Sequence, residues 1–364
     1  MAWVTQFLDG FDHYSTADLG AKWNLAQGAS TGIDTTIFRN SGRALKIGTG
    51  STAGVFKGLT SARNFCIGFG FYMPALAAGS SVTSGSGEPI CSLGESFSFS
   101  SAVGQLGLSV LSDGKIRAVR GSHNGQGFTS AVELGVGLTV MSAATWYYVE
   151  MRVFIDSSAG QVEVRINGVN EFNLSGINTQ HQAFNYASVL AFSGGNSSNT
   201  VTRYYDDLYV RSSSSGSAEA GGFLGDIKVK PYYPNADGTY TAMTCSTGST
   251  HNTLVDETTP NTTDYVSSST ALTKDSYGFQ DVSETGSIKA VQLNAYCYKL
   301  DAGFRGVDVF TKSGATESFA TSVPLSTTPK YLSKVWEQDP NTAADWSQAN
   351  LNAAEFGVRI SADI

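Results

Sequence analysis

Charged residues, proline and cysteine are all scarce in this chain of 364 residues. Only 15% of the residues are charged, and the sequence holds 8 prolines and 4 cysteines. It contains no run of lysines or arginines, and its formal net charge is −8. A surface of this kind does not neutralise phosphates, so we do not expect nucleic acid as a partner.

A long apolar run is also missing. The longest apolar stretch, residues 67–79, is interrupted by Pro74, whereas a membrane-spanning helix needs about 20 apolar residues. We therefore expect no membrane span. The start of the chain lacks the basic segment, the continuous apolar segment and the cleavage site of a signal peptide. We expect synthesis in a cytoplasm without export through a signal peptide.

The few cysteines fall two in each half of the chain: Cys66, Cys91, Cys245 and Cys297. Their even number is compatible with two disulfides, but their spacing is not a metal-ligand pattern and no export signal points to an oxidising compartment. We favour buried free thiols, because free cysteine behaves as a small core residue. Cys297 would then share a strand face with Val291 and Leu293.

The clearest positive pattern lies in residues 147–166. Side chains alternate between apolar and polar along two segments that are separated by a turn at residues 156–160. This alternation predicts an antiparallel hairpin with one buried and one solvated face. The solvated face of its first strand would carry Tyr148, Glu150, Arg152 and Phe154.

Similar strand patterns recur at short intervals, and the chain is rich in turn-forming residues, with 40 glycines. The sequence therefore predicts an all-β fold of two antiparallel β-sandwich (jelly-roll) domains. The first covers residues 1–211 and the second residues 223–364. The Ser/Gly-rich residues 212–222 are expected to form a flexible linker. One short helix is expected near residues 343–354, with Trp346 and Leu351 on the sheet.

The first half resembles the concanavalin A-like, laminin-G-like jelly-roll family through residues 146–168 and Asp206–Val210. In that family the first and last strands lie side by side. The resemblance implies that residues 7–14 pair with residues 204–210, and it implies the fold far better than any activity.

The second half is similar to a β-sandwich module of tailed-bacteriophage structural proteins through residues 230–238, 251–268 and 346–358. The segment at residues 7–14 is also similar to the start of phage virion proteins. This resemblance implies a structural protein located in the virion, with other virion proteins as partners and several copies, or a homo-oligomer, on the particle. It does not separate a capsid or tail decoration from a tail-tip protein.

Catalytic patterns are absent from the sequence. Some relatives of the first domain hydrolyse β-glucans with a Glu-x-Asp-x-x-Glu strand, which this chain lacks. Arg152 and Arg165 follow Glu150 and Glu163 by two residues each, which favours structural ion pairs. We therefore expect a protein that is not an enzyme, and an endoglycanase is disfavoured.

Calcium is the one cofactor that the sequence suggests. The expected pairing of the terminal strands would gather four carboxylates, and laminin-G-like domains often bind this ion: Asp9, Asp12, Asp206 and Asp207. Alternation can instead send Asp206 and Asp207 to opposite faces, and loop hydrogen bonds explain such residues equally well. A weaker candidate is the segment 251–264 with Asp256, Glu257 and Asp264, for which we favour an ordered polar loop.

Trp146, Tyr148 and Phe154 are candidates for an aromatic platform that binds a ligand such as a sugar. Packing against a loop, the linker or a neighbouring subunit is the favoured alternative. Three functions follow in order of preference. They are a phage structural protein, a glycan-binding adhesin or receptor-binding protein that recognises a host surface sugar, and an endoglycanase.

Overall fold

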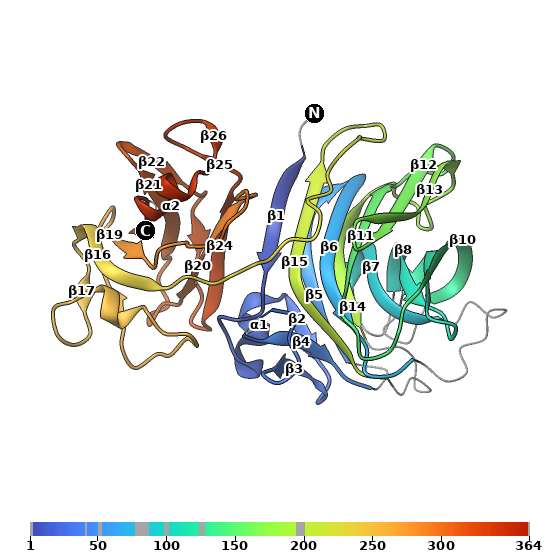
Figure 1. Cartoon of the computed structure of the whole chain (residues 1–364). Coiled ribbons are helices and arrows are strands. Elements are labelled where there is room, and N and C mark those ends of the chain that lie inside the picture. The colour runs from blue at the N-terminus through green and yellow to red at the C-terminus, as the bar shows by residue number, and fades with distance from the viewer. Residues whose placement is uncertain are drawn as a thin grey trace. The chain divides into compact units, whose positions relative to one another are not determined.

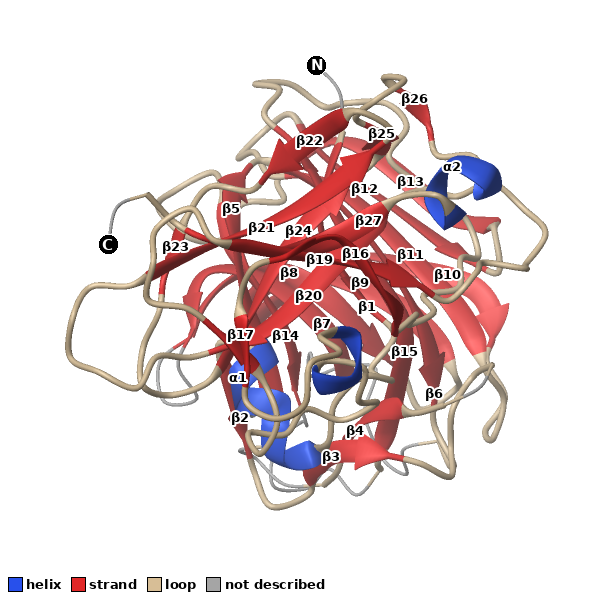
Figure 2. Ribbon diagram, turned by 90° about the vertical axis from the view of Figure 1, so that its left-hand side faces the viewer, coloured by secondary structure: helices blue, strands red, loops and turns tan. Residues whose placement is uncertain are grey.

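The computed structural model describes residues 3–40, 42–49, 53–76, 87–97, 102–123, 128–193 and 201–362. In this part of the chain nearly all regular structure is strand, and the helices are short turns (Figure 2). The all-β class expected from the sequence is confirmed. The chain divides into two compact units, Met1–Val229 and Lys230–Ile364.

The first unit is a sandwich of two antiparallel sheets (Figure 1). Sheet A runs, among the described residues, in the order β13 (Val169–Ile177), β12 (Gly160–Ile166), β11 (Tyr147–Phe154), β6 (Asn64–Tyr72), β15 (Arg203–Ser213), β4 (Ala44–Ile47) and β3 (Thr31–Asp34), with β1 (Val4–Asp9) also paired to β15. Sheet B runs in the order β10 (Phe128–Val140), β9 (Lys115–His123), β8 (Ala102–Val110), β7 (Glu88–Phe97), β14 (Ala187–Ser193), β5 (Gly54–Ala62) and β2 (Leu25–Gln27). Two short helices, η1 (Thr16–Asp18) and α1 (Leu19–Lys22), precede β2.

The core between the two sheets follows from the alternation of β6. Its side chains Phe65, Ile67, Phe69 and Phe71 are at most 1% exposed. The ring of Phe69 lies 5.2 Å from that of Phe192 in the opposite sheet. Full burial of such a side chain stabilises a fold by about 1.5–3 kcal/mol. The apolar residues of this one strand therefore help to hold the two sheets together.

The intervening residues of β6 face outward and include two glycines. A Cβ atom on Gly68 would lie 2.2 Å from the ring of Tyr209, and one on Gly70 would lie 2.6 Å from Cδ of Arg39. Both positions therefore exclude larger residues. The glycines let the side chains of Tyr209 and Arg39 lie flat on the outer face of sheet A.

The first and last strands of the unit are neighbours. Strand β1 pairs antiparallel with β15, with Phe7 opposite Val210 and Asp9 opposite Leu208. The pairing that the jelly-roll resemblance implied is therefore present for residues 7–9 with residues 208–210, whereas residues 10–14 lie beyond the strand. Strand β15 also has an irregular register against β6 between Asp206 and Tyr209, and Asp207 adopts a φ of 50°. The irregularity changes which way the two neighbouring aspartates point.

The second unit contains a larger sheet and three two-stranded ladders in its described residues. The larger sheet has the order β16 (Pro234–Thr241), β19 (Lys274–Phe279), β27 (Glu355–Ile360), β21 (Gly306–Ser313) and β22 (Thr316–Phe319), with β23 (Val323–Pro324) also paired to β21. The ladders are β17 (Thr244–Cys245) with β18 (Val266–Ser267), β20 (Val291–Cys297) with β24 (Lys330–Trp336), and β25 (Gln338–Asp339) with β26 (Ala344–Asp345). Its helices are η2 (Asn252–Leu254) and α2 (Gln348–Asn352).

Helix α2 lies within the range in which one short helix was expected. Ser347 caps it by accepting a hydrogen bond from the amide of Asn350. Trp346 is 3% exposed and joins a core cluster with Trp336 and Phe356, against which Leu351 also packs. The short helix thus places an aromatic and an aliphatic side chain on the core, as the sequence indicated.

All four cysteines are free thiols. Burial raises the pKa of Cys66, Cys91 and Cys297 to about 12, so these thiols stay protonated at neutral pH. Cys297 packs with Leu293 and Ala295 against the second core cluster of its unit. The expectation of buried free thiols is confirmed for Cys66 and Cys91, whereas Cys245 and Cys297 are half-buried free thiols.

Among the described helices, none combines the length and the apolar character that a bilayer crossing requires. The last part of the longest apolar stretch, residues 77–79, lies outside the described residues.

A buried ion pair joins the two sheets of the first unit. Arg203 of β15 is 0% exposed and pairs with Glu88 of β7, which is 7% exposed. Arg203→Met would leave the carboxylate of Glu88 buried without its cation. We expect the free energy of unfolding to fall by about 3–5 kcal/mol, measured by denaturant unfolding. The double variant with Glu88→Gln should lose clearly less, and an equal loss would contradict this account.

Candidate functional site

The hairpin of β11 and β12 lies between β13 and β6 in sheet A, and its pairing is as expected. Val149 lies opposite Ile166, and Val153 lies opposite Val162. The outer face of β11, however, is not solvated. Tyr148 and Glu150 are each 1% exposed and Phe154 is 3% exposed. The prediction of a solvated face was therefore wrong for these residues.

The cover is residues 214–229, which we call the strap. After β15 the chain turns back and runs along sheet A (Figure 1). Its carbonyl groups accept hydrogen bonds from side chains of the unit, with Trp3 donating to Ala220 at 2.8 Å and Arg211 to Gly222 at 3.1 Å. The amide of Gly225 donates to Oε1 of Glu150 at 2.9 Å. Most of the expected linker, residues 212–222, is thus bound to the first unit, and the boundary falls after Val229.

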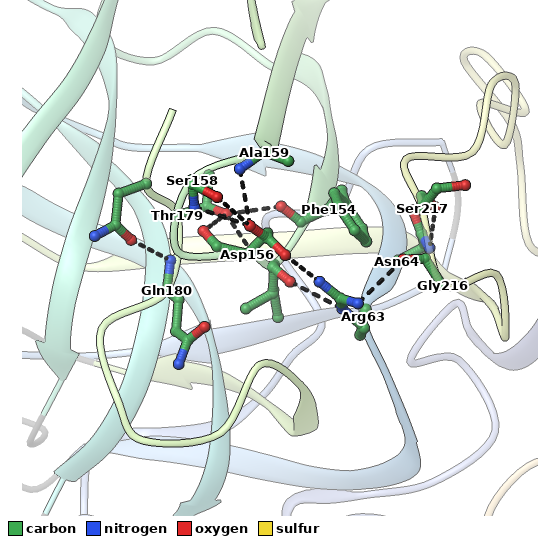
Figure 3. Close-up of polar contacts among 12 residues, drawn as sticks. Arg63, Asn64, Phe154, Asp156, Ser158, Ala159, Thr179, Gln180, Gly216 and Ser217 are labelled. Carbon is green, nitrogen blue, oxygen red and sulfur yellow. Dashed lines mark hydrogen bonds and ion pairs between the residues drawn. The ribbon is translucent and has the colours of Figure 1, made fainter. Parts of the chain in front are cut away.

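The strap begins at the end of the hairpin, where Figure 3 shows its polar contacts. Arg63 pairs with Asp156 and donates to the carbonyl of Gly216 at 3.0 Å. Asn64 donates to the carbonyls of Ser215 and Ser217 at 2.9 and 3.0 Å. These side chains satisfy a segment that has no strand partner, which is why a Ser/Gly-rich sequence is ordered here.

Phe223 anchors the middle of the strap. Its ring lies 4.1 Å from the guanidinium of Arg165 and 5.5 Å from that of Arg152, a stacking arrangement that favours cation–π attraction. Gly222, just before it, has a φ of 94°, and a Cβ there would lie 2.7 Å from the indole of Trp3. Glycine is therefore required at this turn.

The two glutamates of the hairpin do not each pair with the arginine two residues later. Glu163 takes both cations, with Arg152 at 2.5 Å and Arg165 at 2.7 Å. Glu150 has no salt bridge to Arg152 and instead accepts from the hydroxyl of Tyr209 and from the strap. Burial raises the pKa of Glu150. The sequence placed these charges on one face correctly, but the strap determines their partners.

Asp9 and Asp12, two of the four calcium candidates, are held by protein donors. Asp9 is 1% exposed and accepts from Tyr14 at 2.8 Å, Trp23 at 3.2 Å and the amide of Phe11 at 3.0 Å. Asp12 accepts from the amide of Arg43 at 2.6 Å. Burial raises the pKa of Asp12 to about 7, and the nearby charges of Asp207 and Asp9 add to the shift.

Asp206 and Asp207, the other two candidates, both bind Arg39. The amide of Arg39 donates to Asp206 at 2.9 Å, and its guanidinium donates to Asp207 at 2.7 Å. The left-handed φ of Asp207 turns both carboxylates to the same side, against the alternation expected of a strand. Burial, followed by the charge of Asp207, raises the pKa of Asp206 to about 8.

These contacts do not fit calcium. The ion needs six to eight open oxygen ligands, whereas these carboxylates accept from N–H and O–H donors, and Asp207 binds a guanidinium. Among the described residues, no group of three or more His, Cys, Asp or Glu side chains is arranged to hold a metal ion. In the weaker candidate segment, Asn261 binds Glu257, Thr263 and Asp264 as an ordered polar loop.

The three aromatic candidates have separate environments. The guanidinium of Arg39 lies 4.8 Å from the ring of Tyr148, and that of Arg63 lies 4.5 Å from the ring of Phe154. Both rings are buried under these cations and the strap, which matches the alternative of packing against the linker. Trp146 is half-buried and sits beyond them, just before β11.

Trp146 belongs to an aromatic group that the sequence did not reveal. Its ring lies 5.3 Å from that of Tyr72, which in turn lies 5.7 Å from the ring of Tyr204. Tyr72 is half-buried and Tyr204 is buried. The two residues lie directly opposite each other on β6 and β15. We call Trp146, Tyr72 and Tyr204 the platform. Only the register of non-neighbouring strands brings its members together.

Polar groups lie beside the platform. Lys46 of β4 is opposite Tyr204, and its ammonium group is 3.9 Å from the carboxylate of Asp34. Burial, the charge of Asp34 and the neighbouring Tyr72 raise the pKa of Tyr204, so its hydroxyl stays protonated at neutral pH. The outer face of sheet A therefore ends in partly exposed aromatic rings flanked by a cation, an anion and a hydroxyl.

No model of a known protein family matches the chain, and no curated protein matches its sequence. Among solved structures, the binding domain of Paraclostridial Mosquitocidal Protein 1 is 13% identical with a TM-score of 0.37, covering 53% of this chain and 45% of that one. The alginate lyase Aly36B is 10% identical with a TM-score of 0.38, covering 60% and 98%. Domain 4 of AbnA, a GH43 arabinanase from Geobacillus stearothermophilus solved with arabinotriose, is 13% identical with a TM-score of 0.31, covering 51% and 77%. At these values the function has to be argued from the chain's own residues.

The raised pKa of Asp12 predicts a pH-dependent stability. Between its unfolded pKa of 3.8 and its folded pKa of about 7, the folded state holds a proton that the unfolded state lacks. The free energy of unfolding should therefore fall as pH rises from about 4 to about 7. Asp12→Asn keeps an acceptor for Arg43 and should reduce this fall by about 1–2 kcal/mol, allowing for partial exposure. Denaturant unfolding at several pH values measures it, and an unchanged slope would refute the assignment.

Phe223→Ala should loosen the strap, because the ring loses its contacts with two guanidinium groups. A loss of about 1.4 kcal/mol would raise the open population about tenfold, and cleavage by a broad-specificity protease within residues 214–229 should accelerate equally. Lys228→Ala, at an exposed position of the same segment, is the matched control. Equal cleavage rates in both variants would show that Phe223 is not the anchor.

Proposed function

We propose that the chain is a carbohydrate-binding protein without catalytic activity, and that the platform is its binding face. The observation that carries this proposal is the cluster of Trp146, Tyr72 and Tyr204, with ring centroids 5.3 and 5.7 Å apart, at the end of sheet A. From Asp207 toward Tyr204, the outer face carries the partly exposed rings of Trp146 and Tyr72 together with polar groups.

The chemistry of sugars suits such a surface. One side of a pyranose ring carries C–H groups that pack on the negatively polarised face of an aromatic ring. The hydroxyl groups at its edge need donors and acceptors, and Lys46, Asp34 and the hydroxyl of Tyr204 supply both. Small-molecule sites generally have a largely apolar lining, and a few polar groups orient the ligand.

The carboxylates near the centre of the sheet support a binding role over hydrolysis. Glycoside hydrolysis uses two carboxyl groups on either side of the scissile bond. Glu163 is engaged by two arginines, and Glu150 lies under the strap with 1% of its surface exposed. Neither is available to a substrate in this arrangement, so we assign no catalytic residue.

The biological setting that we propose is an adhesin or receptor-binding protein that recognises a host surface glycan. A structural component of a tailed-phage particle is the second candidate, and it rests on the resemblance of residues 230–238, 251–268 and 346–358. The two are compatible if the first unit is presented outward on a virion. Density for the chain in an intact particle would establish the second candidate, and consistent absence from purified particles would remove it.

A glycan array tests the proposed function. The full chain should bind a subset of printed oligosaccharides, and Trp146→Ala should weaken binding at the platform about tenfold, or about 1.4 kcal/mol. Leu138→Ala is a matched control, because Leu138 is an exposed apolar residue of β10 outside the platform, 79% exposed. Tyr204→Phe separates the hydroxyl from the ring. If the wild-type chain binds none of the printed glycans, the proposal is wrong.

A further inference from the structure

A second exposed aromatic pair lies in the loop that carries the chain from β13 in sheet A to β14 in sheet B. Phe184 is 56% exposed, and its ring lies 5.4 Å from that of the half-buried Tyr186 at an interplanar angle of 34°. A large ring held this far into solvent is a cost for folding, because apolar surface is left hydrated. The neighbouring Asn185 is exposed as well.

The loop is held in one conformation by a buried amide. Gln105 of β8 is 0% exposed, and its Nε2 donates to the carbonyl of Phe184 at 2.6 Å and to the carboxylate of Glu95 at 2.8 Å. Its Oε1 accepts from the amides of His181 and Gln182 at 2.7 and 3.1 Å. Both the amide nitrogen and the amide oxygen of Gln105 therefore form hydrogen bonds with the loop backbone. A loop fixed in this way presents its rings without an ordering cost at the moment of binding.

Polar residues lie in the loop and in the strands beneath it. Glu95 is half-buried, and Gln105 ties its carboxylate to the loop. His181 is also half-buried, and burial together with the charge of Arg120 lowers its pKa, so the ring is neutral at neutral pH and both donates and accepts. The loop and the strand beneath it thus carry a carboxylate, a neutral imidazole and an amide, which are groups that bond sugar hydroxyls.

The loop and the platform lie at opposite ends of the sandwich. The loop begins at Thr179, whose side chain donates to the carbonyl of Phe154 at the last residue of β11, whereas Trp146 directly precedes the first (Figure 3 shows the Thr179 end). Strand β11 has 8 residues. At a rise of about 3.3 Å per residue, Trp146 and the start of the loop are roughly 25 Å apart. One saccharide unit does not reach both, so they are separate sites.

We propose that Phe184 and Tyr186 form a second saccharide-binding site, in which a pyranose ring stacks on the aromatic pair and bonds Glu95, His181 and Asn185 at its edge. This inference rests on the proposed carbohydrate-binding function and adds bivalency to it. With sites at both ends, a single first unit bridges two glycan chains.

Calorimetry on the full chain with the strongest oligosaccharide from the array tests the proposal. The wild type should bind two molecules per chain, Phe184→Ala one and Trp146→Ala one, with the double variant binding none. Beads coated with the same oligosaccharide should be agglutinated by the wild type and by neither single variant. Each lost site corresponds to a loss of affinity of at least about tenfold.

Phe304→Ala is the matched control, because Phe304 is also a phenylalanine with 56% of its surface exposed and lies in the second unit. It should leave stoichiometry and agglutination unchanged. If Trp146→Ala abolishes all binding and Phe184→Ala changes nothing, the second site does not exist while the proposed function stands. If the wild type binds no oligosaccharide, both proposals fall. If Phe184→Ala still binds two oligosaccharides per chain but loses binding to a protein, the loop binds a protein partner and the saccharide site is overturned.

Discussion

The arrangement of the first unit's outer face depends on one guanidinium group. Arg39 binds the carboxylate of Asp207, the carboxylate of Asp226 and the carbonyl of Ile227, and it lies over the ring of Tyr148. It therefore connects the irregular part of β15, the end of the strap and the centre of sheet A. Burial raises the pKa of Asp207, and the adjacent guanidinium offsets part of the cost of burying this carboxylate. Because Gly70 has no side chain, Arg39 can lie flat in this position.

Closure of the outer face divides the surface of sheet A into two regions. Over the hairpin, the strap converts a polar strand face into an interior, and charges such as Glu150 become buried groups that need hydrogen-bond donors. Beyond Asp207, the same face remains partly open and carries the platform. A partly open face and a covered face thus lie on one sheet, and the strap sets the border between them. This division explains why Tyr148 and Phe154 are buried whereas Trp146 remains partly exposed.

Local patterns in the sequence were sufficient to predict the strands of the hairpin, their pairing and their inner residues, because alternation has a period of two and involves only neighbours. They were also sufficient for the short helix that places Trp346 on a core. Local patterns could not predict which residues cover the outer face of sheet A. Residues 214–229 are rich in serine and glycine, which usually signals flexibility, and only side chains far away in the sequence, such as Asn64 and Arg211, hold them in place. The platform is equally non-local, since Tyr72, Trp146 and Tyr204 come from segments that meet only in the folded sheet.

The four aspartates considered for calcium and the three aromatic residues considered as a platform show the same physical limit of sequence reasoning. A set of acidic or aromatic residues on adjacent strands has the right composition for a site, but composition does not say which groups already satisfy one another. Asp206 and Asp207 point to the same side only because Asp207 adopts a left-handed backbone conformation, and the donor that they meet there is an arginine of the same unit. Phe184 shows the opposite case. Gln105 binds the backbone of its loop from beneath, while the ring packs on Tyr186 and stays 56% exposed. A side chain that the fold holds rigidly and does not bury is the strongest kind of evidence for binding that this molecule offers.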